Sequence, residues 1–287
     1  AVANSEDASL TVVAEEEEKL GLLAFDLARI PDDAALAAER EAERPGELPA
    51  YHTYATLTSA LQGIAADHPS IARLESAGKS VEGRELWIMK VTRNPDVEED
   101  EPEFRYVAAL HGDEVVGKEN CIEFLNLLTE GYGSDPRITA LVDTTEIWVM
   151  PSANPDGTEL HRRYNKKNVD LNRDFPDQFR DPVDTVTRRA PETVALMNWG
   201  FTHSPVFSAN FHGGSLVASY AYTGTADTWS NYNASPDDAM FVSLARTYAD
   251  DNPAMLASNG DAAFDNGICN GADWYVIYGG FQDWNYV

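Results

Sequence analysis

The stretch FRYVAALHGDE, residues 104–114, joins an apolar run to a polar turn. Residues 104–110 are rich in aromatic and branched side chains, which predicts a strand that is covered on both faces. Residues 115–130 then carry apolar side chains at helical spacing, and Gly131 ends that pattern. The stretch therefore predicts a strand, a turn and a helix, which is the repeating unit of α/β proteins.

The turn in this stretch places a histidine and a glutamate three residues apart. At the start of a helix, His111 and Glu114 would project from one face. An imidazole nitrogen and a carboxylate oxygen on one face can fill two positions of a tetrahedral zinc site. The alternative is a helix start whose glutamate complements the helix dipole, and the pair alone does not decide between the two.

The composition limits the class of protein. The 287 residues suffice for one large α/β domain with a sizeable core. A formal net charge of −27 argues against nucleic acid and anionic membrane surfaces as partners. No apolar run approaches the length of a membrane span. Because an acidic surface fits a secreted or salt-adapted protein, we expect a secreted or periplasmic location.

Acidic runs and cysteines carry little functional information. The runs at residues 15–18 and 98–101 are predicted to be solvated loops rather than binding sites. Cys121 and Cys269 are equally consistent with two free thiols and with one disulfide. Neither has a neighbouring base in the sequence, which argues against a cysteine nucleophile.

The chain divides into a leader and a main domain. Residues 1–50 are rich in Ala and Glu and end in a Pro- and Gly-containing segment, so we expect an acidic leader or linker. The alternative is an amphipathic cap on the main domain. Residues 51–287 alternate between strand and helix patterns, which predicts an α/β fold with a mixed, mostly parallel central sheet and helices on both faces.

The expected elements place the polar motifs between them. Strands are predicted at residues 71–75, 85–92, 104–110, 145–150, 206–211 and 216–222. Helices are predicted at residues 54–68, 115–130 and 237–248, with another before residue 206, and residues 154–181 form a long polar loop that begins with the turn NPDG. In such folds reactive groups collect at the carboxyl edge of the sheet.

Five segments, HGDE among them, have a characteristic order and spacing. They are GKSVEGREL (78–86), HGDE (111–114), DLNRDFPDQF (170–179), HGG (212–214) and GGFQDWNY (279–286). Together they resemble the M14 family of metallocarboxypeptidases, most closely the carboxypeptidase N/E (regulatory) branch, from about Tyr51 to the last residue. The resemblance implies the zinc carboxypeptidase fold, one zinc ion, and hydrolysis of the C-terminal peptide bond of peptides or proteins.

The resemblance also implies a metal site. His111, Glu114 and His212 correspond to the zinc ligands of the family, and three protein ligands leave one position for water. Asp170 corresponds to the aspartate that orients a zinc-bound imidazole through its second nitrogen, with His111 as the expected partner. The alternative for Asp170 is an Asx turn in a loop.

One pair of residues and one further arginine correspond to the substrate-binding groups of the family. Asn172 and Arg173 match the pair that binds the terminal carboxylate, for which a guanidinium offers a bidentate fork. Arg163 matches the arginine that stabilises the oxyanion as water attacks the carbonyl. Arg162 is adjacent, and a shift of one position would exchange the two.

The substrate side chain is expected to meet a pocket that departs from the family pattern. Tyr275 matches the mobile tyrosine that caps the substrate, and Tyr278 is its rival. The branch carries an acidic residue where this chain has Thr223, while Gln282 occupies a second pocket position. Because a buried cation without a carboxylate is costly, we expect a pocket that is not strictly selective for Lys or Arg. Asp227 is close enough in sequence to supply the charge instead.

The general base is the second departure. The resemblance places this glutamate on a strand after Val287, and it places the β-sandwich domain of the branch later still, so we expect a fragment of a longer protein. Loss of a general base typically costs about 10²–10⁴-fold in rate. Two alternatives therefore stand beside the enzyme: a non-catalytic zinc-containing module that binds peptide termini, and an amidase of the same fold that acts on cell-wall peptides.

Overall fold

The computed structural model describes residues 51–258 and 261–286. The predicted leader, residues 1–50, lies outside the described residues. Within the described part, no helix is long and apolar enough to cross a membrane.

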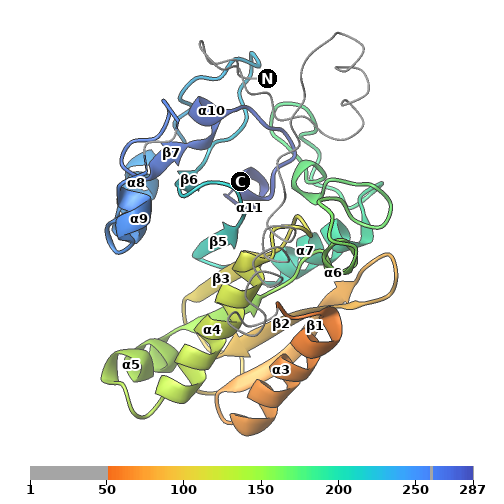
Figure 1. The fold of residues 1–287 in the computed structure, drawn as a ribbon, viewed down its shortest axis with the longest axis vertical. Coiled ribbons are helices and arrows are strands. Elements are labelled where there is room, and N and C mark those ends of the chain that lie inside the picture. Colours follow the sequence, from red (N-terminus) through yellow and green to blue (C-terminus); the bar gives the residue numbers. More distant parts are fainter. Residues whose placement is uncertain (1–50, 259–260, 287) are drawn as a thin grey trace, which may run out of the picture. The chain divides into compact units, whose positions relative to one another are not determined.

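A five-stranded sheet forms the centre of the fold (Figure 1). Its strands, in spatial order, are β1 (Ala72–Lys79), β2 (Glu85–Val91), β4 (Glu146–Met150), β3 (Glu103–Ala108) and β5 (Phe207–Phe211). β2 is antiparallel to both of its neighbours, whereas β3 is parallel to β4 and β5. The prediction of a mixed sheet in which most strands share one direction is confirmed.

Helices cover both faces of this sheet, as the sequence predicts. On β4, Ile147 and Val149 pack in a core cluster with residues of the helices α3 (Tyr54–Asp67) and α4 (Val116–Gly131). The alternate residues Trp148 and Met150 pack on the opposite face with α7 (Pro191–Thr202). Because successive strand residues point to opposite faces, one short strand serves both cores.

The helix ends show why the elements begin where they do. Thr53 caps α3 by accepting a hydrogen bond from the Thr56 N–H at 3.3 Å. A further helix, α5 (Pro136–Thr144), was not predicted from periodicity. The Asp135 side chain caps it by accepting from the Arg137 N–H at 2.8 Å, and its first residue is proline. The cap and the proline mark the start of this helix in the sequence, and Ile138, Leu141 and Val142 follow at helical spacing.

The remaining elements, apart from the 13-residue helix α8, are short. The strands β6 (Ala218–Tyr220) and β7 (Ile268–Asn270) pair in parallel as a separate two-stranded sheet, so the predicted strand at 216–222 is shorter than expected. The predicted loop 154–181 contains two helical turns. The helix predicted at 237–248 is α8 (Asp238–Asp250). The short helices are α6 (Pro155–Glu159), the 3₁₀ turn η1 (Leu171–Arg173), α9 (Pro253–Leu256), α10 (Gly271–Trp274) and α11 (Phe281–Tyr286).

Both cysteines are buried free thiols. Burial raises the pKa of Cys121, and it raises the pKa of Cys269 to about 11. A neutral thiol is a poor nucleophile, which agrees with the prediction that neither cysteine is catalytic.

Candidate active site

The site begins where β3 ends. Ala109 adopts a left-handed φ of 51°, which turns the chain out of the strand. The helix α4 starts at Val116, so His111 and Glu114 lie in the turn before it rather than on the helix itself. The Glu114 N–H donates to the His111 carbonyl at 3.3 Å and closes this turn. The two side chains still face each other, so the expected juxtaposition comes from a turn.

Three candidate metal ligands converge on one point. The Nδ1 atoms of His111 and His212 lie 2.8 and 2.7 Å from the two carboxylate oxygens of Glu114. The two Nδ1 atoms lie 3.2 Å apart, and all three ligand atoms lie within 4.8 Å of one another. His212 directly follows β5, so neighbouring parallel strands bring the two histidines together. Two nitrogens and a carboxylate on one face form a donor set suited to zinc.

Asp170 lies on the far side of His111. Its Oδ1 atom is 3.1 Å from the His111 Nε2 atom, opposite the nitrogen that faces Glu114. The same oxygen accepts the Asn172 N–H at 3.0 Å, which forms an Asx turn at the start of η1. The two alternatives for Asp170 therefore coexist in one side chain.

Arg163, and not Arg162, faces this cluster. Its Nε and Nη2 atoms each lie 2.9 Å from the Asp170 Oδ2 atom, and its Nη1 atom lies 3.2 Å from His111 Nδ1. The Arg162 guanidinium instead donates to the Asn168 side chain at 3.1 Å and to a loop carbonyl. The guanidinium of Arg163 therefore places positive charge beside the three candidate ligands.

The electrostatics of the cluster favour ionised carboxylates. Burial opposes ionisation of Glu114, but its bonds with His111 and His212 outweigh burial and hold its pKa well below the usual range. Burial likewise opposes ionisation of Asp170, and the bonds with His111 and the charge of Arg163 again lower its pKa. Both carboxylates are therefore anionic at neutral pH, as a metal ligand and its orienting partner require.

Asn172 and Arg173 lie beside the same cluster. The Asn172 Nδ2 atom is 3.4 Å from the His212 Nε2 atom, and its Oδ1 atom accepts the Phe281 N–H at 2.9 Å. Arg173 is exposed, and its Nη1 atom donates only to the Asn172 carbonyl, at 2.8 Å, among the described residues. An amide fixed from both sides and an exposed guanidinium can together bind an anion next to the candidate metal ligands.

Residues 57–287 match the family model described as zinc carboxypeptidase. The chain belongs to the zinc carboxypeptidase family. It is 43% identical over 253 residues to carboxypeptidase D of Mus musculus, and this covers 83% of the chain and 18% of that protein. It is also 43% identical over 255 residues to carboxypeptidase M of Mus musculus, with 83% and 56% coverage. The resemblance inferred from the motifs is confirmed.

Solved structures share the fold at lower identity. The carboxypeptidase A of Helicoverpa armigera matches with a TM-score of 0.71 and 18% identity, covering 94% of this chain and 69% of that one. Thrombin activatable fibrinolysis inhibitor matches with a TM-score of 0.67 and 20% identity, covering 82% and 63%. The chain spans less than two thirds of the length of the curated relatives named above.

The two candidate capping tyrosines of this zinc carboxypeptidase chain differ in their surroundings. The Tyr278 hydroxyl donates to the Thr225 carbonyl at 2.9 Å, and the Arg180 guanidinium stacks on the Tyr278 ring at 4.6 Å. Tyr275 is 43% exposed, and its hydroxyl makes no hydrogen bond to any described residue. Tyr275 is therefore the freer of the two to reach a ligand.

The predicted pocket residues lie near α11. Thr223 is buried, and its N–H donates to the carboxylate of Asp283 at 2.9 Å. The Gln282 amide nitrogen is buried without a partner among the described residues. Asp227 is exposed and accepts the Trp229 N–H at 3.2 Å. The Asp283 carboxylate accepts hydrogen bonds from backbone N–H groups. It therefore does not replace the acidic residue that the family branch has at position 223.

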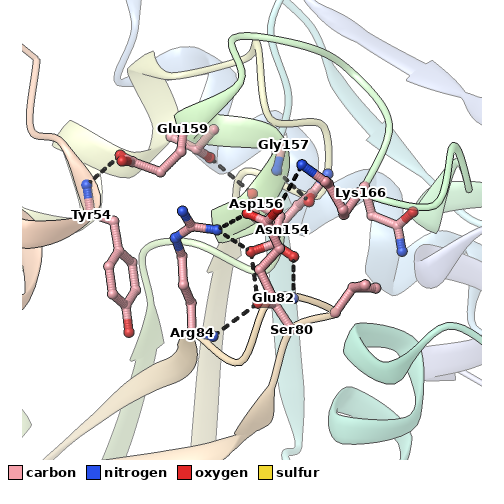
Figure 2. A network of polar contacts seen from close by, with 12 residues as sticks. Tyr54, Ser80, Glu82, Arg84, Asn154, Asp156, Gly157, Glu159 and Lys166 are labelled. Atoms are coloured by element: carbon pink, nitrogen blue, oxygen red, sulfur yellow. Dashed lines mark hydrogen bonds and ion pairs between the residues drawn. The ribbon is translucent and has the colours of Figure 1, made fainter.

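A polar network around Asp156, shown in Figure 2, was not predicted from the sequence. At its centre the fully buried Asp156 accepts from the Ser80 hydroxyl at 2.7 Å, the Glu82 N–H at 2.9 Å and the Arg84 guanidinium at 2.6 Å. Glu82 also pairs with Lys166 at 2.6 Å, in the loop between Arg163 and Asp170. The motifs at 78–86 and 154–157 are far apart in sequence, and only their shared polarity hinted at this contact.

A second acidic group does not resemble the first. The carboxylates of Glu98, Glu103 and Glu146 approach one another, but the Lys90 ammonium lies 2.6 Å from Glu146 and 3.6 Å from Glu98. The Lys90 ammonium therefore already pairs with two of these three carboxylates. Among the described residues, the cluster of His111, Glu114 and His212 is therefore the better candidate metal site.

Proposed function

We propose that this protein is a carboxypeptidase that removes the C-terminal residue from peptides or proteins, with one zinc ion held by His111, Glu114 and His212. The observation that carries this proposal is the convergence of two Nδ1 atoms and a carboxylate within 4.8 Å, beside the Arg163 guanidinium. When bound, zinc supplies a Lewis acid that makes a bound water nucleophilic near neutral pH. Membership of the zinc carboxypeptidase family supports this assignment.

The surrounding residues have separate tasks in this proposal. Arg173 and Asn172 bind the terminal carboxylate, which makes the protein selective for chain ends. Arg163 stabilises negative charge on the oxygen of the scissile carbonyl. Asp170 holds the tautomer of His111 that leaves Nδ1 free as a ligand. Tyr275, with its free hydroxyl, closes over the substrate terminus.

Neither Glu114 nor Asp170 is suited to accept a proton from the attacking water. Glu114 and Asp170 are committed to their histidine and arginine partners, and their lowered pKa values make both carboxylates weak bases. The family resemblance implies that a different glutamate is the general base. Activity is therefore to be measured on the full gene product.

The pocket supports a substrate preference broader than basic residues. Thr223 brings no charge, Gln282 offers a neutral amide, and Asp227 is exposed and bonded to its own loop. A lysine or arginine side chain would enter such a pocket without a carboxylate partner, which is costly. We therefore include apolar and neutral polar C-terminal residues among the proposed substrates.

The test combines zinc analysis with product analysis. Wild type should bind one zinc per chain and release single C-terminal residues from peptides, as followed by mass spectrometry. His212→Ala should lose both properties because one of three ligands is gone. His68→Ala is the control, because His68 only ends α3.

The outcomes separate the alternatives. Equal zinc content in wild type and His212→Ala would refute the metal site. Binding of peptides through a free C-terminus without release of the last residue would support the non-catalytic binding module. Release of amino acids only from cell-wall peptides would support the amidase of the same fold.

A further inference from the structure

Asn154 is a fully buried residue whose side chain uses all of its hydrogen-bonding groups. It lies between β4 and α6, with 0% of its surface exposed. Its Nδ2 atom donates to the carbonyls of Leu110 and Arg163, each at 3.2 Å. Its Oδ1 atom accepts the Gly157 N–H at 2.9 Å and caps α6. Since two carbonyls can only face a donor, the orientation of the amide is unambiguous.

The two carbonyls belong to the loops that form the site. Leu110 directly precedes the candidate ligand His111, and Arg163 is the residue whose guanidinium faces that histidine. The Arg163 carbonyl also accepts the Gly112 N–H at 3.2 Å. One side-chain amide therefore ties the ligand turn to the arginine loop, although 52 residues separate His111 from Arg163.

The ligand turn and α6 are in close contact around the Asn154 amide. A Cβ atom on Gly112 would lie 2.1 Å from the Gly157 carbonyl carbon, and a Cβ atom on Gly157 would lie 2.5 Å from the Asn154 Nδ2 atom. Backbone therefore contacts backbone, and only glycine fits at either position. Because the two loops are in close contact, we expect their spacing to depend on the hydrogen bonds from the Asn154 amide.

Arg163 is held at both of its ends. The Asp170 carboxylate fixes the guanidinium, while Asn154 and Gly112 fix the backbone carbonyl. Without the Asn154 donor the Arg163 carbonyl would keep only the Gly112 N–H, so the backbone that carries the guanidinium would be less firmly fixed relative to Asp170 and His111.

We propose that Asn154 is a positioning residue that sets Arg163 against the metal-ligand face through its two amide N–H donors. The inference rests on the proposed function, since Arg163 acts on substrate only if the protein is a carboxypeptidase. It differs from a purely structural role, in which Asn154 would serve only as the cap of α6. The network of Asp156 in Figure 2 also holds α6 in place. The role of Asn154 as a helix cap can therefore be separated experimentally from its role in positioning Arg163.

The substitution Asn154→Asp separates these two roles. Aspartate keeps an acceptor for the Gly157 N–H and is as good a helix cap as asparagine. It loses both donors and presents a carboxylate oxygen to two carbonyls. Asn252→Asp is the matched control, because Asn252 also precedes proline and caps α9 by accepting the Met255 N–H at 3.2 Å.

Steady-state kinetics on the full gene product give the first readout. Asn154→Asp should lower kcat by ~10–100-fold, as expected for a displaced catalytic group, with KM and zinc content unchanged. In an Arg163→Ala background the same change should lower kcat by less than about twofold, because residues that act together are not additive. Asn252→Asp should leave kcat unchanged in both backgrounds. Additive effects in the two backgrounds would overturn the proposal.

A second readout does not depend on activity. In zinc-free protein, the Nε–H of Arg163, which bonds to Asp170 at 2.9 Å, should give a protected NMR signal that is absent in Arg163→Lys. Asn154→Asp should remove the protection and Asn252→Asp should keep it. If wild type shows this dependence without any peptidase activity, the proposed function fails while the positioning role stands.

Asn154→Ser guards against a failure to fold. Serine also caps a helix but brings no buried charge and no amide donors. It should reproduce the fall in kcat at near-native thermal stability. Unfolding of both Asn154 variants, or a native signal of the Arg163 Nε–H in either, would overturn the proposal.

Discussion

At the scale of single residues, Thr223 is predicted to determine which C-terminal residue is accepted. Thr223→Asp would add a buried carboxylate where a basic substrate side chain is expected to lie. A charged hydrogen bond contributes about 1.5–3 kcal/mol, so the preference for Arg-ended over Leu-ended peptides should rise ~10–100-fold in kcat/KM. Competition between two peptides, followed by mass spectrometry, measures this ratio.

Asp227 provides the counter-test for the same pocket. Asp227→Asn should leave the substrate preference unchanged, because the Asp227 carboxylate is exposed and bonds to the Trp229 N–H. A selective loss of activity on Lys- and Arg-ended peptides in Asp227→Asn would mean that this residue, and not position 223, supplies the charge. Thermal stability is measured for Thr223→Asp as well, because the new carboxylate would lie next to that of Asp283.

Asp170 is predicted to contribute to zinc affinity without touching the ion. Asp170→Asn keeps the shape but removes the charge that orients His111 and holds Arg163. Loss of such a partner typically weakens metal binding about 10–100-fold, which competition with a chromogenic chelator measures. Asp174→Asn is the control, because Asp174 accepts the Ala190 N–H instead. An unchanged affinity in Asp170→Asn would show that His111 is oriented by other groups.

At the scale of elements, the contact between the ligand turn and α6 is predicted to tolerate no side chain. Gly112→Ala places a Cβ atom 2.1 Å from backbone, and overpacking of this kind costs about 1–3 kcal/mol or more in free energy of unfolding. Gly63→Ala in α3 meets nothing within 4 Å and should stabilise the helix by about 0.5–1 kcal/mol. Urea denaturation measures both, and equal stability of the two variants would contradict the close packing.

The elements differ in how far the sequence could predict them. β3 and α4 have long apolar patterns that predict them, whereas α5 is only nine residues long and was not predicted, although Asp135 caps its start. The short helices in the loop 154–181 depend on tertiary contacts. Asn154 caps α6 while donating to Leu110, 44 residues away, and no local pattern contains that information.

The residues of the site also differ in how far the sequence could predict them. His111, Glu114 and His212 stand in recognisable motifs, so sequence alone could assemble them. The sequence favours Arg163 over Arg162 only through the family motif, because the choice depends on which guanidinium the loop turns toward Asp170. Spacing locates a motif, but the direction of a side chain within a loop is decided by its hydrogen bonds.

At the scale of the whole molecule, zinc is predicted to act as a cross-link between distant parts of the chain. His111 and Glu114 follow β3 and His212 follows β5, so one ion would join two strands of the central sheet. A ligand that binds only the folded state at 100 times its Kd stabilises it by about 2.7 kcal/mol. For a domain of this size that corresponds to a rise in Tm of about 5–10 °C.

Calorimetry of the chelator-treated protein before and after addition of zinc measures this rise. His212→Ala should show almost no rise, because two ligands from one turn no longer connect the strands. An equal rise in wild type and His212→Ala would place the stabilising ion elsewhere, and the acidic group at Glu98, Glu103 and Glu146 would be the first place to look. The pairing of Lys90 with that group argues for the first outcome, since a zinc ion there would have to displace an ammonium that lies 2.6 Å from Glu146.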